Sequence, residues 1–216
     1  GIDAIPLSSA GRNFVDQYKA HLISLGINID FIAVADDVAN CASCMMINDV
    51  HGNQVIGFYP GPDNPRRQSP ETLPFIDNIA LTILGPEEPE LTLRQGRILF
   101  EHNVPLMVDP GQVISAFSRD QIRELLKLAQ YLVINHHEFE VLKTNGGLTD
   151  EEVFGQVPEV VLTRGDKGVA IYSREGICHV DAVPDVKVDE VTGCGDAFRA
   201  GYAYGIVNNL NLTERG

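Results

Sequence analysis

A glycine-rich segment near the carboxyl end of the chain, residues 192–201 (TGCGDAFRAG), combines residue types suited to anion binding and proton transfer. Gly193 and Gly195 carry no Cβ, so their backbone N–H groups can turn toward a common point. The helix-compatible run Ala197–Val207 follows, and a helix N-terminus adds unpaired N–H donors and a partial positive charge. Such a loop can bind a phosphate oxygen or a developing oxyanion. Asp196 would accept the proton of a hydroxyl that attacks phosphorus.

An ordinary strand-to-helix turn, in which Asp196 only caps the helix, is the competing interpretation. Short glycine motifs are common, so the spacing alone favours neither interpretation. The stretch from Glu190 to Ala203 resembles the second signature of the ribokinase/PfkB family of carbohydrate and nucleoside kinases. This resemblance implies that Asp196 is the catalytic base. It also implies that the glycine loop is the anion hole, formed by the amides of Gly193, Cys194 and Gly195.

The segment departs from the family pattern at two positions. Glu190 stands where the family usually has an aspartate, and Cys194 stands where alanine is usual, as in part of the nucleoside-kinase branch. Neither change removes the loop or the base. The resemblance also assigns Thr192, beside the loop, to nucleotide binding.

Composition limits the fold and the partners. The chain has 216 residues, of which 44% are hydrophobic, so we expect one α/β domain over residues 1–216. A formal net charge of −14 argues against nucleic acid and anionic membranes as partners. No apolar run approaches the length needed to cross a bilayer. An anionic nucleotide would therefore be held by local devices such as a helix N-terminus, a glycine loop or a divalent cation.

The cysteines indicate a reducing setting. Cys41, Cys44, Cys178 and Cys194 are too few and too scattered for a disulfide scaffold, so a cytoplasmic location is expected. Cys41 and Cys44 fall on a predicted strand, where residues three apart face opposite sides. We therefore do not expect them to share a metal ion.

Hydrophobic spacing and capping signals predict most elements. Helices are predicted at 14–25, 91–101, 119–130 and 136–142, and strands at 31–35, 41–47, 54–59, 79–84, 105–109, 131–134, 160–162 and 169–172. Gly26 sits where a glycine would end the first helix. Strands 41–47 and 54–59 form a predicted hairpin. Capping boxes are predicted at Ser118 with Gln121 and at Thr149 with Glu152.

The alternation of strands and helices predicts the fold. Apolar strands that alternate with helices form a mostly parallel, doubly wound sheet covered on both faces. We therefore expect a ribokinase-like α/β fold with a small β hairpin or lid element. Ligands of such sheets bind beyond the carboxyl ends of the strands. Four polar residues lie just after predicted strands and should share that edge: Asp109, Asn135, Thr163 and Thr192.

Asn135 and Glu138 follow an apolar strand and open a helix. An N-cap asparagine followed by a surface turn explains this pair without any function. The pair also matches the family's Asn-x-x-Glu motif. That resemblance assigns Asn135 to nucleotide binding and lets Glu138 act on Mg²⁺ indirectly, through water, which suits an ion that takes few carboxylates.

The run from Thr163 to Gly168 (TRGDKG) resembles the family's Thr-x-Gly-x-x-Gly hairpin near the nucleotide. The resemblance assigns Thr163, Gly165 and Gly168 to cofactor binding, since a hydroxyl and glycine amides can approach phosphate or ribose closely. A plain hairpin turn, in which the glycines supply positive φ, is the alternative. Arg164 and Lys167 are expected to be solvated surface residues.

Asp109 begins the sequence Asp-Pro-Gly-Gln, which looks like the bacterial adenosine-kinase-like branch. By this resemblance Asp109 orients the substrate or a phosphate. A turn aspartate before proline is the alternative.

The resemblance covers about Leu7 to Gly205, nearly the whole chain, whereas family members are longer at both ends. The missing parts would hold the substrate-binding and lid elements and the helices that close around adenine. The chain is therefore expected to be incomplete at both ends and to lack a complete substrate pocket.

The resemblance implies an ATP-dependent, Mg²⁺-assisted kinase acting on a primary hydroxyl of a nucleoside or sugar. Adenosine is the preferred acceptor, while fructose and ribose stay open, as does a homodimer. A non-catalytic nucleotide- or sugar-binding regulator on the same fold is the alternative of another class. The presence of Asp196 and Glu138 favours the kinase, because a pure binder gains little from a base in an anion hole.

Overall fold

A computed structural model describes residues 2–48, 54–62, 69–186 and 192–216 of the chain. The chain divides into two compact units, residues 1–72 and residues 73–216, and each is described by itself. The prediction of one domain over residues 1–216 stays a prediction.

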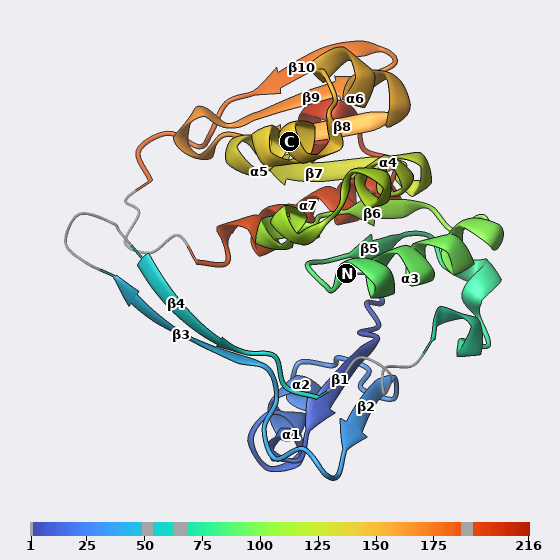
Figure 1. Cartoon of the computed structure of the whole chain (residues 1–216), viewed down its shortest axis with the longest axis vertical. Coiled ribbons are helices and arrows are strands. Elements are labelled where there is room, and N and C mark those ends of the chain that lie inside the picture. The colour runs from blue at the N-terminus through green and yellow to red at the C-terminus, as the bar shows by residue number, and fades with distance from the viewer. Residues whose placement is uncertain (1, 49–53, 63–68, 187–191) are drawn as a thin grey trace. The chain divides into compact units, whose positions relative to one another are not determined.

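The larger unit is built on a six-stranded sheet with the strand order β10-β9-β8-β7-β6-β5 (Figure 1). Its strands are β5 (Thr82–Leu84), β6 (Leu106–Val108), β7 (Tyr131–Asn135), β8 (Glu159–Thr163), β9 (Val169–Ser173) and β10 (Gly176–Val180). Strands β5 to β8 pair in parallel, and β9 and β10 continue the sheet in antiparallel pairing. The expectation of a mostly parallel sheet is confirmed, whereas the edge strand β10 was not predicted.

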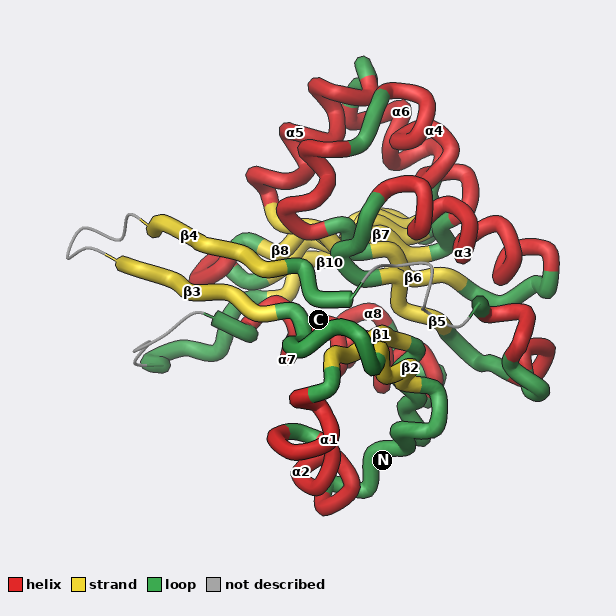
Figure 2. The backbone as a smooth tube through the Cα atoms, turned by 60° about the horizontal axis from the view of Figure 1, so that its bottom comes forward, coloured by secondary structure: helices red, strands yellow, loops and turns green. Residues whose placement is uncertain are grey.

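Helices cover both faces of this sheet, as predicted. Figure 2 shows α3, α4, α5 and α6 on one side of the strands and α7 with α8 on the other. Their bounds are α3 (Pro89–Glu101), α4 (Arg119–Leu128), α5 (His136–Gly146), α6 (Asp150–Gln156), α7 (Cys194–Val207) and α8 (Leu212–Arg215). Three short 3-10 turns join these elements, at Ile76–Asn78, Gly111–Ala116 and Gly165–Lys167.

The sequences of the central strands are continuously hydrophobic because both faces of the sheet are covered by apolar layers. Successive strand residues point to opposite faces, so a strand covered on both faces needs apolar side chains at every position. Val133 of β7 and Val161 of β8 join the cluster around Tyr202 of α7. Leu132 and Ile134, the neighbours of Val133, are also buried.

The predicted capping boxes are present at the starts of α4 and α6. Ser118 Oγ accepts from the Gln121 amide at 3.4 Å, and the Gln121 side chain accepts from the Ser118 amide at 2.9 Å. Thr149 and Glu152 exchange the same two bonds at 3.2 and 2.8 Å. These local signals need no tertiary partner, which is why the sequence reveals them.

The smaller unit contains two separate two-stranded sheets. β1 (Ser8–Gly11), which was not predicted, pairs in parallel with β2 (Ile32–Ala35). The single helix predicted at 14–25 is instead two helices, α1 (Asn13–Gln17) and α2 (Lys19–Ser24). They separate at Tyr18, whose φ of −118° departs from helical geometry. Gly26 has a φ of +73°, as expected for a glycine that ends a helix.

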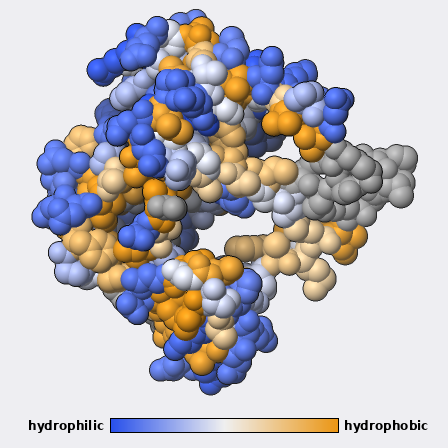
Figure 3. Space-filling model, turned by 180° about the vertical axis from the view of Figure 1, so that it is seen from behind, coloured by the Kyte–Doolittle hydropathy of each residue, from blue (hydrophilic) through white to orange (hydrophobic). Residues whose placement is uncertain are grey.

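The predicted hairpin is formed by β3 (Ser43–Asn48) and β4 (Gln54–Tyr59), in antiparallel register, and its connecting residues 49–53 lie outside the described residues. Cys41 precedes β3, so the predicted strand starts two residues too early. The hairpin exposes apolar side chains such as Met45 and Phe58, and Figure 3 shows apolar side chains on the outside of the molecule. Its role as a lid stays a prediction.

All four cysteines are free.

None of the described helices combines the length and the apolar character that a membrane span requires.

A buried polar cluster fixes α7 and α8 to the amino end of β8. Tyr202 Oη donates to Glu159 Oε1 at 2.8 Å, and Arg215 Nη1 donates to both Glu159 oxygens at 3.1 and 3.2 Å. Tyr202 is fully buried and Glu159 nearly so. Burial and the adjacent Glu159 carboxylate raise the pKa of Tyr202, so its hydroxyl stays a donor.

Tyr202→Phe should therefore lower the free energy of unfolding by about 1–3 kcal/mol, because it removes one donor from a buried carboxylate. Tyr204→Phe is the matched control, since Tyr204 lies on the same helix and is exposed. Its effect should stay within about 0.5 kcal/mol. Urea unfolding of both variants measures the difference, and equal stabilities would show that the Glu159 bond does not anchor the helix.

Candidate active site

Three of the predicted polar residues meet at the carboxyl edge of the sheet. Asn135 ends β7 and Thr163 ends β8, and the two are direct partners in the parallel register. Asp109 follows β6, and its amide donates to the Leu84 carbonyl at 2.9 Å. Thr192 is exposed and lies two residues before the start of α7, while Glu190 lies outside the described residues.

The predicted anion loop is the start of α7. Gly193 is the N-cap with a φ of +85°, a conformation that favours glycine. The helix begins at Cys194 rather than Ala197, so the prediction of where it starts was wrong by three residues. Gly195 and Asp196 therefore lie in the first turn, where N–H groups have no partner within the helix. The freedom of glycine is needed at Gly193, whereas Gly195 has an ordinary helical backbone.

Asp196 is presented to solvent by this turn, since its side chain is 71% exposed. At Gly193, the N-cap of α7, no side-chain capping bond is present among the described residues, so the interpretation of Asp196 as a capping residue is not supported. Its carboxylate instead forms an ion pair with Arg199, one turn further along the helix. An exposed carboxylate beside N–H groups that have no partner within the helix remains accessible to a substrate hydroxyl.

Asp109 has two partners. Its Oδ1 accepts from the Gly111 amide at 3.0 Å, and its Oδ2 lies 2.9 Å from Arg199 Nη1. The first contact is the turn that the alternative interpretation predicted. The second contact connects Asp109 through Arg199 to Asp196. The role of Asp109 toward a substrate stays a prediction.

Burial governs the protonation of Asp109. Desolvation raises its pKa from the ordinary 3.8 to about 6, while Arg199 acts in the opposite direction. Glu138 raises the pKa further, the Gly111 hydrogen bond lowers it, and Asp196 raises it. These interactions place Asp109, Glu138 and Asp196 in one electrostatic environment.

Asn135 and Glu138 form a capping box at the start of α5. Asn135 Oδ1 accepts from the Glu138 amide at 2.9 Å, and Glu138 Oε2 accepts from the Asn135 amide at 3.2 Å. The structural interpretation of this pair is therefore confirmed. It does not exclude a ligand, because a carboxylate oxygen accepts more than one bond. The assignment of Glu138 to Mg²⁺ stays a prediction.

The glycine hairpin after β8 has the positive φ values that its turn requires, +60° at Gly165 and +71° at Gly168. A Cβ on Gly168 would come within 2.0 Å of the Val180 carbonyl oxygen, so close packing as well as the positive φ requires glycine here. A Cβ on Gly165 would meet nothing within 4 Å. Arg164 is half-buried and its Nη2 donates to the Val169 carbonyl at 3.5 Å, so the expectation that it is solvated was wrong.

Arg199 is the site residue that sequence reasoning missed. Its spacing of three residues from Asp196 on a helix was a usable signal for that ion pair. Its contact with Asp109 was not, because 90 residues separate the two in the sequence. This contact depends on how α7 lies across the sheet.

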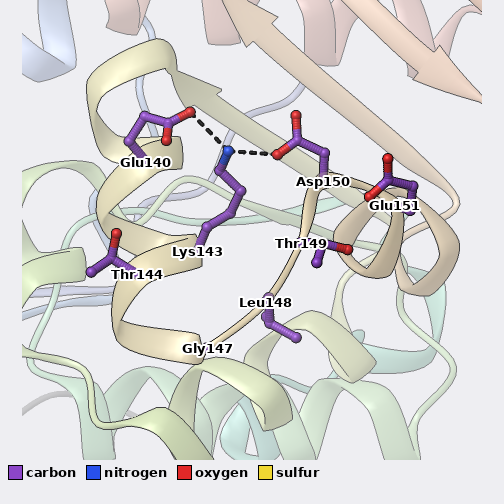
Figure 4. A pocket seen from close by; sticks show the side chains of 8 residues that line it. All are labelled: Glu140, Lys143, Thr144, Gly147, Leu148, Thr149, Asp150 and Glu151. Atoms are coloured by element: carbon purple, nitrogen blue, oxygen red, sulfur yellow. Dashed lines mark hydrogen bonds and ion pairs between the residues drawn. The ribbon is translucent and has the colours of Figure 1, made fainter.

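A separate surface pocket lies at the far end of α5, about 16 Å along the helix from its start. Figure 4 shows Lys143 Nζ between Glu140 and Asp150, at 2.8 and 2.5 Å. Its cation is thus already paired with two carboxylates, so this pocket is a poor anion site. Its lining residues are Glu140, Lys143, Thr144, Gly147, Leu148, Thr149, Asp150 and Glu151.

Known proteins share this sequence pattern and fold. Residues 1–215 match the pfkB family of carbohydrate kinases. The chain is 25% identical over 217 residues to a nucleoside kinase of Methanocaldococcus jannaschii, covering 100% of this chain and 70% of that protein. It is 28% identical over 223 residues to a ribokinase of Lactococcus lactis, covering 99% and 67%. The nucleoside kinase of Burkholderia thailandensis in complex with inosine has a TM-score of 0.91 at 29% identity, covering 99% and 71%.

The chain belongs to the pfkB family of carbohydrate kinases. It is a phosphotransferase with an alcohol group as acceptor, and its fold is the ribokinase fold. The resemblance and the fold class inferred from the sequence are thus confirmed.

Asp109→Asn should change how stability depends on pH. The raised pKa means that folded Asp109 binds more protons than unfolded Asp109 between about pH 4 and 6, so wild type loses stability as the pH rises. Asparagine cannot titrate. Wild type should therefore lose roughly 2–3 kcal/mol relative to the variant between about pH 4 and 7. Urea unfolding across this range measures it, and a constant difference would show that Asp109 ionises normally.

Proposed function

We propose that the protein is an ATP-dependent kinase that phosphorylates a primary hydroxyl of a nucleoside, with Asp196 as the catalytic base. The observation that carries the proposal is the exposed Asp196 carboxylate in the first turn of α7, beside Gly193 in its left-handed conformation. A base and a set of N–H donors are thus presented at one point. Phosphoryl transfer needs this combination of positioning and charge stabilisation.

In the proposed reaction Asp196 accepts the proton of the acceptor hydroxyl. The hydroxyl oxygen forms a bond to the γ-phosphorus of ATP, and the bond from that phosphorus to its bridging oxygen breaks. The products are the phosphorylated acceptor and ADP. The amides of Gly193, Cys194 and Gly195 would donate to the oxygens of the transferring group, where one such donor contributes about 3 kcal/mol in a water-excluded site.

The residues fit a phosphate group. Within the described part of the chain, a Cβ on Gly193 or Gly195 would meet no atom of another segment within 4 Å, which supports the approach of a ligand to the backbone there. The resemblance adds Thr192, Asn135, Thr163, Gly165 and Gly168 as nucleotide-binding residues. The structure of the Burkholderia thailandensis nucleoside kinase in complex with ADP-inosine supports nucleotide binding by a related chain, with a TM-score of 0.83.

Mg²⁺ fits the same site as an ion coordinated mainly by phosphate and water. The described residues contain no cluster of three or more side chains that could enclose a metal. Mg²⁺ is commonly bound through one or two carboxylates together with substrate phosphates. Glu138 is half-buried and acts on Asp109 electrostatically, which supports an indirect role for it. The bound ion would neutralise charge on the phosphate oxygens.

A nucleoside is favoured as the acceptor because related proteins named nucleoside kinase match nearly the whole chain, one of them in complex with inosine. Adenosine stays our preferred nucleoside, from the Asp-Pro-Gly-Gln sequence that begins at Asp109. Ribose and fructose are the alternatives, and a ribokinase is among the related proteins. We also retain a homodimer as a hypothesis.

Asp196→Asn should reduce turnover by about 10²–10⁴-fold while ATP affinity holds or improves, because the base and one negative charge are lost. Stability should change by less than about 1 kcal/mol, because the Asp196 side chain is 71% exposed and Arg199 keeps its other partner, Asp109. The assay is ADP production by the full-length protein with adenosine, inosine, ribose and fructose. Near-normal turnover in the variant would show that Asp196 is not the base. If wild type phosphorylated none of the four acceptors, the assignment of kinase activity would be contradicted.

Glu138→Gln should raise the Mg²⁺ concentration for half-maximal activity by about 10-fold or more. Glutamine preserves a capping box, so the substitution removes the charge while keeping the start of α5. Glu152→Gln is the matched control, because Glu152 occupies the same position in the capping box of α6. Identical Mg²⁺ titrations for the two variants would limit Glu138 to its structural role.

A further inference from the structure

We infer that Arg199 is a positioning residue that holds the Asp196 carboxylate in place by linking it to Asp109. The inference rests on the proposed function of Asp196 as the base. It adds a residue that the glycine motif does not require and that acts through Asp196 rather than on the substrate.

The guanidinium group uses two nitrogens for two carboxylates. Nη1 of Arg199 lies 2.9 Å from Asp109 Oδ2, and Nη2 pairs with Asp196 Oδ1. The planar guanidinium fixes the angle between these two nitrogens. The position of one carboxylate therefore constrains the position of the other.

One end of this bridge is anchored. The Asp109 side chain is 14% exposed, and its second oxygen accepts from the Gly111 amide. Arg199 is 15% exposed, so both members of the first pair are largely buried and have little freedom. The second partner, Asp196, is 71% exposed and would otherwise sample several rotamers. The bridge thus transmits the rigidity of a buried turn to an exposed base.

Charge explains why the link is a cation. Glu138 and Asp196 both act on Asp109 as like charges, and Arg199 opposes them. The Asp109 and Asp196 carboxylates would repel each other without a cation between them. Arg199 lets the exposed base approach the buried carboxylate, at the place where the substrate hydroxyl would lose its proton.

Arginine and lysine should differ at this position. Lysine carries one compact ammonium group and lacks the fork that spans two carboxylates. Arg199→Lys should keep the charge and lose the geometry. Arg199→Met should lose both while preserving the apolar stem.

Full-length wild type, Arg199→Lys, Arg199→Met, Asp196→Asn and the double variant Asp196→Asn/Arg199→Met test the inference by ADP production with adenosine. We expect Arg199→Met to lower kcat by about 10–100-fold, as misplacement of a catalytic group does, with KM for ATP within about threefold of wild type. The kcat of Arg199→Lys should lie between those of wild type and Arg199→Met. The double variant should be no slower than Asp196→Asn, because a positioning residue has no effect once its base is gone.

Arg97→Met is the control, since Arg97 forms a two-nitrogen pair with Glu124 on the surface of α3 and α4. Its kcat should equal that of wild type. Wild-type kcat in Arg199→Met, losses that multiply in the double variant, or a raised KM for ATP at unchanged kcat would each overturn the inference. If Arg199→Met does not fold, Arg199→Lys alone and in the Asp196→Asn background supplies the same comparison. An inactive wild type or a fully active Asp196→Asn would instead contradict the proposed function.

Discussion

The packing of α7 across the sheet is the constraint on which the site depends. Tyr202 is buried against side chains of the central strands, including Val133 and Val161, and its hydroxyl reaches Glu159 at the amino end of β8. This contact fixes the helix along its axis as well as against the sheet. The start of α7 is thereby held at the carboxyl edge, where Arg199 meets Asp109. A helix free to slide by one turn would shift its first residues by about 5 Å and break this contact.

Two carboxylates, one at the amino ends of the strands and one at the carboxyl ends, differ in how their charge is compensated. Glu159 is satisfied by Tyr202 and Arg215, so its cluster stabilises the packing and leaves no group exposed for chemistry. Asp109 shares its cation with Asp196, and burial raises its pKa to about 6. Perturbed pKa values of this kind cluster at functional sites in proteins. The carboxyl edge is therefore where the chain combines burial, charge and access.

Local signals made much of the fold predictable. Capping boxes, the positive φ of the glycine turns and the apolar periodicity depend on residues within a few positions of one another, so the sequence displays them directly. The family resemblance rested on such segments and was confirmed. The strands β1 and β10 were missed because Ser8–Gly11 and Gly176–Val180 lack a strong apolar pattern and owe their conformation to a neighbouring strand. The break at Tyr18 likewise has no punctuating glycine or proline.

Short segments and repeated patterns were enough to identify the class of fold. They also singled out the glycine loop, Asp196 and the Asn135–Glu138 pair as candidates for the site. The sharing of Arg199 by Asp109 and Asp196 became visible only in the folded chain. Sequence separation explains why. A contact between residues 109 and 199 forms only when a helix from one end of the unit packs across strands from its middle. The sequence identifies candidate residues, and the packing of helices against the sheet sets which of them are in contact.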